Sequence, residues 1–177
     1  DAAILEMDLE QIGPGAAITE DGARVHLMLN AGPFGDLSDR QRSFIDGVGL
    51  YRTEFIFLAR SRFPTEDEQE SEYRAELETY APMSVVMRTL DIGGDKSLPY
   101  FSIEEENPFL GWRGIRVTLD HPEIFLTQIR AMLRANSGLR NLRILLPMIT
   151  TLEELRASKV LIERVVLELR AEGASVT

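Results

Sequence analysis

Short apolar runs alternate along the chain with longer stretches that place apolar residues at helical spacing. The apolar runs, which are typical of strands buried on both faces, span residues 25–30, 48–52, 85–89 and 142–148. The helical stretches span residues 38–45, 65–80, 120–135 and 151–173. This alternation predicts four successive βα units, which require parallel strands joined by right-handed crossovers.

Polar residues that can cap the N-terminus of a helix stand at the start of each helical stretch. They are Ser38, Thr65, Asp120 and Thr151. A glutamate follows each of the two threonines at the spacing of a capping box, and Pro122 suits the first turn of the third helix. We therefore expect these residues to fix where the helices begin.

Residues 31–35, directly after the first apolar run, separate two candidate architectures. A dinucleotide-binding open sheet would carry the spacing G-x-G-x-x-G there, whereas the chain reads AGPFG. We therefore predict an α/β fold that forms a partial (β/α)8 TIM barrel, roughly its first four βα units. Four units would leave the first and last strands as open edges, which pair readily with other chains, so we also expect a homodimer.

The second and third apolar runs end in the same pair of residues, an arginine followed by a threonine. The chain reads VGLYRTEF from residue 48 and VVMRTLD from residue 85, so Arg52 and Arg88 are expected at the same depth of neighbouring strands. A guanidinium group is always charged and pairs with two oxygens of a carboxylate or phosphate. Two such groups aimed at one point favour a small dianion or trianion as ligand. The alternative is that both arginines form structural ion pairs with Glu54 and Asp91.

The overall charge limits the classes of partner. The chain has 177 residues with a formal net charge of -10, and no lysine or arginine cluster dominates any segment. Proteins that bind nucleic acid or anionic membranes normally present a basic face, so neither partner is expected. The chain contains no cysteine, and it shows neither a signal peptide nor an apolar run of membrane-spanning length. We expect a cytoplasmic protein that binds an anionic small ligand through local arginines.

A long connection follows the third apolar run. It carries Gly93, Gly94, Asp95, Lys96, Asn107, Trp112, Arg113 and Arg116. Connections of this length are usually functional or disordered, and the Trp, Phe and Leu residues in this one argue against disorder. The double glycine lets the backbone turn sharply or approach a ligand closely. We interpret the segment as a site loop.

Five motifs carry a resemblance to a known family. They are, in order, GVGLYRTEFIF, FPTEDEQ, VVMRTLDIGGDK, EEENPFLGWRGIR and LRILLPMI. Together they resemble enzyme I of the phosphoenolpyruvate-dependent phosphotransferase system, over essentially the whole chain. Residues 118–132, which read TLDHPEIFLTQIRAM, are more similar to its nitrogen-type paralogue than to the sugar-transport enzyme.

The resemblance implies a phosphoenolpyruvate-binding (β/α)8 domain that passes a phosphoryl group to a histidine on a separate swivelling domain. That histidine then phosphorylates a small histidine-containing phosphocarrier protein. Residues 1–24 would be the end of the swivelling domain and its linker, and residues 25–177 the N-terminal half of the barrel domain. The family's phosphoacceptor histidine, Mg²⁺-binding carboxylates and catalytic cysteine match no residue of this chain, so we expect the chain alone to be inactive.

The resemblance also implies roles for individual residues. Arg52 and Arg88 match the two arginines that hold phosphoenolpyruvate. The supporting residues are Lys96 and Arg113 as further basic groups, Asn107 as a residue that orders the loop, and Thr53 and Asp91 as groups that orient the arginines. Guanidinium groups suit the task, because they neutralise the phosphate and stabilise charge on the transferring group.

Two alternatives stay open beside this interpretation. Dikinases and phosphoenolpyruvate synthases share the LxRTE element, but the stretch from IGGDK to NPFLGWR is not expected in them. In the second alternative, the chain is a non-catalytic fragment that serves in folding or dimerisation. His26 and His121 match no phosphohistidine motif and are interpreted as structural or solvated residues.

Overall fold

The computed structural model describes residues 15–32, 38–93, 98–101 and 110–176. Its strands are β1 (Ala17–Ile18), β2 (Arg24–Val25), β3 (Met28–Ala31), β4 (Gly47–Arg52), β5 (Ser84–Arg88) and β6 (Leu142–Leu145). Its helices are α1 (Asp39–Arg42), α2 (Glu54–Leu58), α3 (Glu66–Tyr80), α4 (Ile115–Asp120), α5 (Pro122–Ala135) and α6 (Leu152–Ala171). None of the helices within the described ranges combines the length and the apolar character needed to span a membrane.

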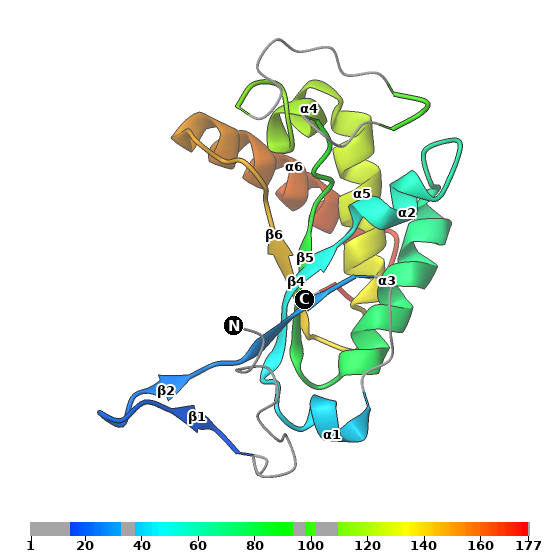
Figure 1. The fold of residues 1–177 in the computed structure, drawn as a ribbon. Helices are drawn as coiled ribbons and strands as arrows, with labels where there is room; N and C mark the ends of the chain where they lie inside the picture. The colour runs from blue at the N-terminus through cyan, green and yellow to red at the C-terminus, as the bar shows by residue number, and fades with distance from the viewer. Residues whose placement is uncertain (1–14, 33–37, 94–97, 102–109, 177) are drawn as a thin grey trace.

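The main sheet pairs four parallel strands in the order β3-β4-β5-β6, which is also their order along the chain. A helix-containing connection joins each strand to the next, and the hairpin of β1 and β2 projects away from this sheet (Figure 1). A dinucleotide-binding open sheet reverses its strand order, whereas a (β/α)8 barrel keeps it. The order therefore confirms the predicted α/β fold of alternating parallel units, as in part of a TIM barrel.

The helices cover one face of this sheet. α3 and α5 pack against each other beside the strands (Figure 1). The fully buried residues of this core include Val48, Val85, Met87, Tyr73, Leu77, Phe125 and Ile129. Along β5, Val85 and Met87 are buried whereas Val86 and Arg88 are partly exposed. Because side chains alternate between the two faces of a strand, Arg88 extends toward the face that α3 and α5 do not cover.

Three of the four predicted helix caps are confirmed. Ser38 caps α1, Thr65 caps α3 and Thr151 caps α6. Each cap side chain accepts a hydrogen bond from the backbone N–H three residues later, and the side chain at that later position bonds back to the cap residue. These reciprocal bonds satisfy backbone groups that the first turn of a helix leaves without partners.

The predicted cap at Asp120 is wrong. Asp120 is the last residue of α4, and His121 separates α4 from α5 without a side-chain cap bond. The Asp120 carboxylate instead accepts a hydrogen bond from Trp112 Nε1 at 2.6 Å, so it anchors the end of the preceding loop. Pro122 lies in the first turn of α5, as predicted.

The first predicted strand is divided in the structure. β2 pairs with β1 in the antiparallel hairpin, and β3 alone joins the main sheet. The carboxylate of Asp46 accepts a hydrogen bond from the Leu27 backbone N–H at 2.9 Å and another from Arg24 at 2.6 Å. Because these bonds occupy the backbone donor of Leu27, the strand is interrupted there, and His26 lies between two strands rather than inside one.

Two short helices and one strand end differ from the prediction. α2 follows β4 at once and α4 precedes α5, but both are too short to give a periodic signal. Arg116 therefore lies on α4 and not in the loop. The last strand ends at Leu145 instead of Met148, because Pro147 has no N–H for a strand ladder and Met148 adopts φ 63°.

Candidate functional site

Two arginines lie side by side at the carboxyl edge of the main sheet. Arg52 and Arg88 are the last residues of β4 and β5, and their Cα atoms are register partners. Tyr51 and Met87, the residues before them, are buried. Both arginines therefore extend toward the face that α3 and α5 leave uncovered. The two guanidinium groups thus arise at the same depth of neighbouring strands, as the repeated Arg-Thr pair suggests.

Two buried carboxylates hold the guanidinium group of Arg88. Its Nη2 lies 2.5 Å from Glu54 Oε1, and its Nη1 lies 3.0 Å from Asp91 Oδ2. The side chains of Glu54 and Asp91 are only 2% and 4% exposed, so water and salt screen these ion pairs weakly. The ion pairs considered as the structural alternative are thus present at Arg88, and they set the orientation of its guanidinium group.

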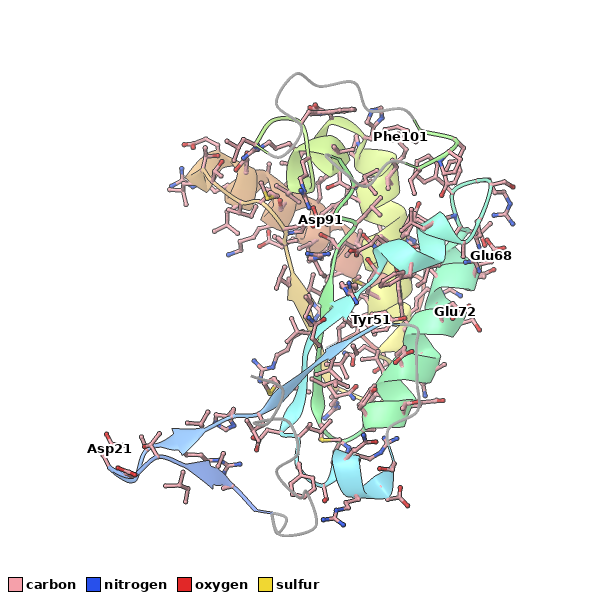
Figure 2. The ribbon with its side chains drawn as sticks, viewed as in Figure 1. Asp21, Tyr51, Glu68, Glu72, Asp91 and Phe101 are labelled. Carbon is pink, nitrogen blue, oxygen red and sulfur yellow. The ribbon has the colours of Figure 1, made fainter. Side chains whose placement is uncertain are left out.

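Asp91 also brings a third arginine to the site. Its Oδ1 accepts a hydrogen bond from Arg113 Nε at 3.1 Å, and its Oδ2 accepts one from Arg113 Nη2 at 3.2 Å. The carboxylate therefore lies between Arg88 and Arg113, beyond the end of β5 (Figure 2). The backbone of Gly114 approaches it closely, because a Cβ atom there would stand 3.3 Å from Asp91 Oδ1. The returning end of the loop thus places Arg113 beside the strand ends.

Arg52 has a different environment. Its guanidinium carbon lies 4.8 Å from the ring centroid of Phe55, which is a cation–π arrangement. A Cβ atom at Gly32 would stand 3.2 Å from Arg52 Nη2, so the glycine leaves room for the guanidinium group. Among the residues that the structure describes, no carboxylate forms an ion pair with Arg52, and its buried Nε has no hydrogen-bond partner. The positive charge of Arg52 is consequently compensated less than that of Arg88.

These five residues together carry an excess of positive charge. They are Arg52, Arg88 and Arg113, which carry three positive charges, and Glu54 and Asp91, which carry two negative charges. The chain as a whole has a net charge of -10, so the sum over these five residues is opposite in sign to the overall charge. An anion with several oxygen atoms complements such a group, because guanidinium donors pair with two oxygens at once.

Thr53 supports Arg88 through the backbone. Its Oγ1 donates a hydrogen bond to the backbone carbonyl of Arg88 at 2.7 Å. Thr53 therefore positions the strand end that carries the arginine, rather than the guanidinium group itself. Lys96 and Asn107, also predicted as supporting residues, lie outside the described residues.

The sequence pattern does not single out two residues that the structure places here. Glu54 enters the sequence interpretation only as an alternative ion-pair partner, yet it is almost fully buried against Arg88. Gln128 lies on α5, is 0% exposed, and donates a hydrogen bond to Thr53 Oγ1 at 3.1 Å. The one signal for Gln128 is a polar side chain on an otherwise apolar helix face, since a buried amide needs hydrogen-bond partners.

The two histidines have structural surroundings, as interpreted from the sequence. His26 precedes β3 at the amino edge of the sheet, and its Nδ1 lies 3.7 Å from Asp46 Oδ2. The ring of His121 lies 5.1 Å from that of Phe101 and 5.7 Å from that of Trp112, measured between centroids. Trp112 thus packs with His121 and Phe101 in an aromatic cluster at the end of the loop, and His26 lies at the opposite edge of the sheet from the arginines.

The described residues do not fit a Mg²⁺ site of their own. Within them, no group of three or more His, Cys, Asp or Glu side chains is placed to hold a metal ion. Both oxygens of Asp91 face arginine groups, and Glu54 Oε1 faces Arg88. Mg²⁺ is normally held by one or two carboxylates together with phosphate oxygens, so carboxylates other than Glu54 and Asp91 would have to bind the ion.

Comparison with known proteins identifies relatives over most of the chain. Residues 7–177 match the family described as "PEP-utilising enzyme, PEP-binding domain", where PEP is phosphoenolpyruvate. The "Phosphoenolpyruvate-dependent phosphotransferase system" protein of Escherichia coli (strain K12) is 54% identical over 145 residues, which are 82% of this chain and 19% of that protein.

Two further relatives share a different name. The "Phosphoenolpyruvate-protein phosphotransferase" of Staphylococcus carnosus is 46% identical over 172 residues, which are 97% of this chain and 30% of that protein. Its namesake from Listeria innocua is 43% identical over 178 residues, covering 100% of this chain and 31% of that protein. The chain thus spans between 19% and 31% of the length of these curated relatives. It belongs to the family of the PEP-binding domain of PEP-utilising enzymes.

Proposed function

We propose that this chain is the phosphoenolpyruvate-binding part of a phosphoenolpyruvate-protein phosphotransferase, enzyme I of the phosphotransferase system. The register pair of Arg52 and Arg88 at the carboxyl edge of the sheet carries the proposal. In (β/α)8 enzymes the active site lies at that edge, at the ends of the strands. The family match and the names of the relatives support phosphoenolpyruvate as the ligand.

The two arginines have different tasks in this proposal. Arg88, whose orientation Glu54 and Asp91 set, presents its guanidinium group to the substrate phosphate in a fixed direction. Arg52 has no described carboxylate partner and supplies the stronger net attraction for the anion. Both groups stabilise charge on the phosphoryl oxygens while the bond from phosphorus to the enol oxygen breaks and a bond to a histidine nitrogen forms.

Three further residues extend the proposed site. Arg113 reaches it through the shared carboxylate of Asp91 and is suited to pair with a second anionic group of the substrate. Lys96 is proposed as an additional basic contact, and Asn107 as a residue that orders the loop. These last two roles rest on the resemblance to enzyme I.

The phosphoryl acceptor is proposed to lie on another domain. His26 stands at the amino edge of the sheet, and the ring of His121 packs against those of Phe101 and Trp112, which supports structural roles for both. We accordingly propose residues 1–24 as the end of a swivelling domain and its linker, and residues 25–177 as the N-terminal half of the barrel domain. The final acceptor would be a histidine-containing phosphocarrier protein, and this chain alone would not catalyse transfer.

Several properties are proposed for the whole protein. Residues 118–132 support the nitrogen-type paralogue, and Mg²⁺ would be held by groups other than those described above. For the 177-residue chain by itself we propose a homodimer, because β3 and β6 are the outer strands of the described sheet and strand edges without a partner associate readily. Light scattering should then report a mass near twice 19.9 kDa, and a monomer at high concentration would argue against the dimer.

The proposed ligand site can be tested by calorimetric titration of phosphoenolpyruvate into the chain and three variants. We expect saturable binding that weakens at least about tenfold in Arg52→Gln and in Arg88→Gln, since each substitution removes a charge-assisted contact. Arg164→Gln, at an exposed position of α6, is the matched control and should bind like the unmodified chain. Binding that survives both site substitutions would show that the ligand lies elsewhere, and no binding to the unmodified chain would favour the non-catalytic fragment.

A further inference from the structure

A buried series of side-chain hydrogen bonds runs from α3 to α5. Gln69 Nε2 donates to the backbone carbonyl of Pro64 at 3.0 Å, and the Tyr73 hydroxyl donates to Gln69 Oε1 at 3.0 Å. Gln128 Nε2 on α5 then donates to the Tyr73 hydroxyl at 3.0 Å. The three side chains are 2%, 0% and 0% exposed, so water does not replace these partners. Buried polar groups with complete partners of this kind rigidify the elements they join.

Gln128 continues this series to the end of β5. Its Nε2 also donates to Thr53 Oγ1 at 3.1 Å, and its Oε1 accepts from the Leu90 backbone N–H at 2.7 Å. Thr53 Oγ1 in turn donates to the Arg88 backbone carbonyl at 2.7 Å. Gln128 thus contacts the backbone on both sides of Thr89, directly at Leu90 and through one hydroxyl at Arg88. These backbone groups lie at the end of β5: Arg88 is the last residue that pairs with both neighbouring strands, the Thr89 N–H donates to the Leu145 carbonyl at 2.9 Å, and Leu90 follows beyond the strand.

The required donors and acceptors explain why an amide stands at this position. The hydroxyl groups of Thr53 and Tyr73 each donate their hydrogen to another acceptor. Each hydroxyl oxygen can therefore only accept a hydrogen bond from the side chain of residue 128. The Leu90 N–H needs an acceptor. A glutamine offers two N–H donors and one carbonyl oxygen, which match these three needs, whereas an ionised glutamate would offer acceptors alone.

We propose that Gln128 is a positioning residue for the arginine site. It holds the backbone from Arg88 to Leu90 and so sets the direction of Arg88 and of Asp91, which follows directly. The hydrogen bonds of Gln128 go to Thr53, Tyr73 and the Leu90 backbone rather than to the Arg88 side chain, so it acts through Thr53 and the strand end. This inference rests on the proposed function for the identity of the ligand, phosphoenolpyruvate.

A first test needs no ligand. Side-chain Nε–Hε signals of the arginines are recorded by nuclear magnetic resonance on the 177-residue chain, and the Arg88 signal is assigned by its loss in Arg88→Lys. Gln128→Leu and the nearly isosteric Gln128→Glu are expected to shift this signal and to speed its exchange with water. Tyr73→Phe, the matched control, removes a buried hydroxyl from the same series but keeps the contacts to Thr53 and Leu90, so the Arg88 signal should stay in place.

Two threonine variants keep the test decisive if the Gln128 variants do not fold. Thr53→Val removes the bridging hydroxyl at nearly constant volume and should reproduce the shift of the Arg88 signal. Thr53→Ser restores the hydroxyl and should return the signal toward its original position. An unchanged Arg88 signal in Thr53→Val or in a folded Gln128→Leu variant would overturn the inference.

A second test measures affinity for phosphoenolpyruvate together with the free energy of unfolding. We expect Gln128→Leu to bind about tenfold more weakly, the effect of roughly one misplaced charge-assisted hydrogen bond, and Tyr73→Phe to bind within about twofold of the unmodified chain. Equal affinity of all three proteins would overturn the positioning role while leaving the proposed function intact. If the unmodified chain binds no phosphoenolpyruvate, the proposed function fails instead, and the ligand-free signal of Arg88 still decides the role of Gln128.

Discussion

The guanidinium groups of Arg52 and Arg88 extend from partnered positions of neighbouring strands, yet of these two arginines only Arg88 is held by buried carboxylates of the described residues. Because of this asymmetry, we assign attraction of the anion mainly to Arg52 and its orientation mainly to Arg88. The proposed phosphate ligand would meet one arginine whose direction is already set and one whose charge is less compensated. Removing one arginine should therefore have different consequences from removing the other.

Arg88→Gln should destabilise the fold much more than Arg52→Gln. The first substitution leaves Glu54 and Asp91 buried with one cation fewer, and breaking a buried ion pair costs about 3 kcal/mol or more. The second removes a guanidinium group whose Nε is already buried without a hydrogen bond, so we expect a loss below about 1 kcal/mol. Urea unfolding followed by circular dichroism measures both values. Equal losses in the free energy of unfolding would show that Arg88 does not stabilise the buried carboxylates of Glu54 and Asp91.

Gly114→Ala should lower both stability and affinity for phosphoenolpyruvate. Gly114 has φ 58°, and a Cβ atom there would stand 3.1 Å from Met148 Cγ and 3.3 Å from Asp91 Oδ1. We expect a stability loss of about 1–3 kcal/mol from backbone strain, together with weaker binding because Asp91 is displaced. Gly138→Ala is the control, since its φ is also positive, at 80°, but no atom crowds its Cβ.

Thermal unfolding gives the stability of both variants, and calorimetry gives their affinities. The control should lose stability without losing affinity. If both variants bind phosphoenolpyruvate equally well, the close approach of Gly114 to Asp91 does not matter for the site.

Acid should destabilise the start of α6 through Glu154. Hydrogen bonds from the Thr150 and Thr151 backbone N–H groups lower the pKa of Glu154 to about 2 from its ordinary value of 4.5. A carboxylate whose pKa is lowered on folding stabilises the protein above its ordinary pKa, and this contribution disappears as the pH falls toward the folded value. Unfolding measured between pH of about 5 and about 2 should therefore be less pH-dependent in Glu154→Gln.

The exposed neighbour Glu153 provides the control for this comparison. Glu153→Gln lies in the same first turn and should keep the pH dependence of the unmodified chain. A Glu154→Gln curve that parallels the curve of the unmodified chain would mean that the capping contacts do not persist in solution.

The chain should not phosphorylate its own histidines. His26 lies at the amino edge of the sheet, whereas the arginines lie at the carboxyl edge, and the ring of His121 packs against those of Phe101 and Trp112. Incubation with phosphoenolpyruvate and Mg²⁺, followed by mass spectrometry at neutral to basic pH, should show an unmodified chain. A phosphorylated peptide that contains either histidine would refute the proposal that the acceptor lies on another domain.

The features that sequence reasoning predicted are those with local signals. The capping boxes at Thr65 and Thr151 depend on residues three positions apart, and both are present. The matched depth of Arg52 and Arg88 follows from two apolar runs that end in the same residue pair, because neighbouring parallel strands bring their carboxyl ends to the same edge of the sheet.

The features that sequence reasoning did not predict depend on contacts between distant residues. Asp46 interrupts the first strand through a bond to Leu27, 19 positions away. Gln128 donates a hydrogen bond to Thr53, 75 positions away in the sequence, and no local pattern predicts that contact. Asp120 is a residue type that often caps helices, but here it is the last residue of α4 and its carboxylate accepts a hydrogen bond from Trp112.

The most direct measurement of the central claim follows the arginine side chains themselves during titration with phosphoenolpyruvate. Nuclear magnetic resonance resolves Nε–Hε signals of individual arginines, and Arg52→Lys and Arg88→Lys assign the two that matter. We predict that both signals shift saturably with one common dissociation constant, while the signal of the exposed Arg164 stays unchanged. Saturable binding that leaves the Arg52 and Arg88 signals in place would contradict the assignment of these residues to the phosphate site.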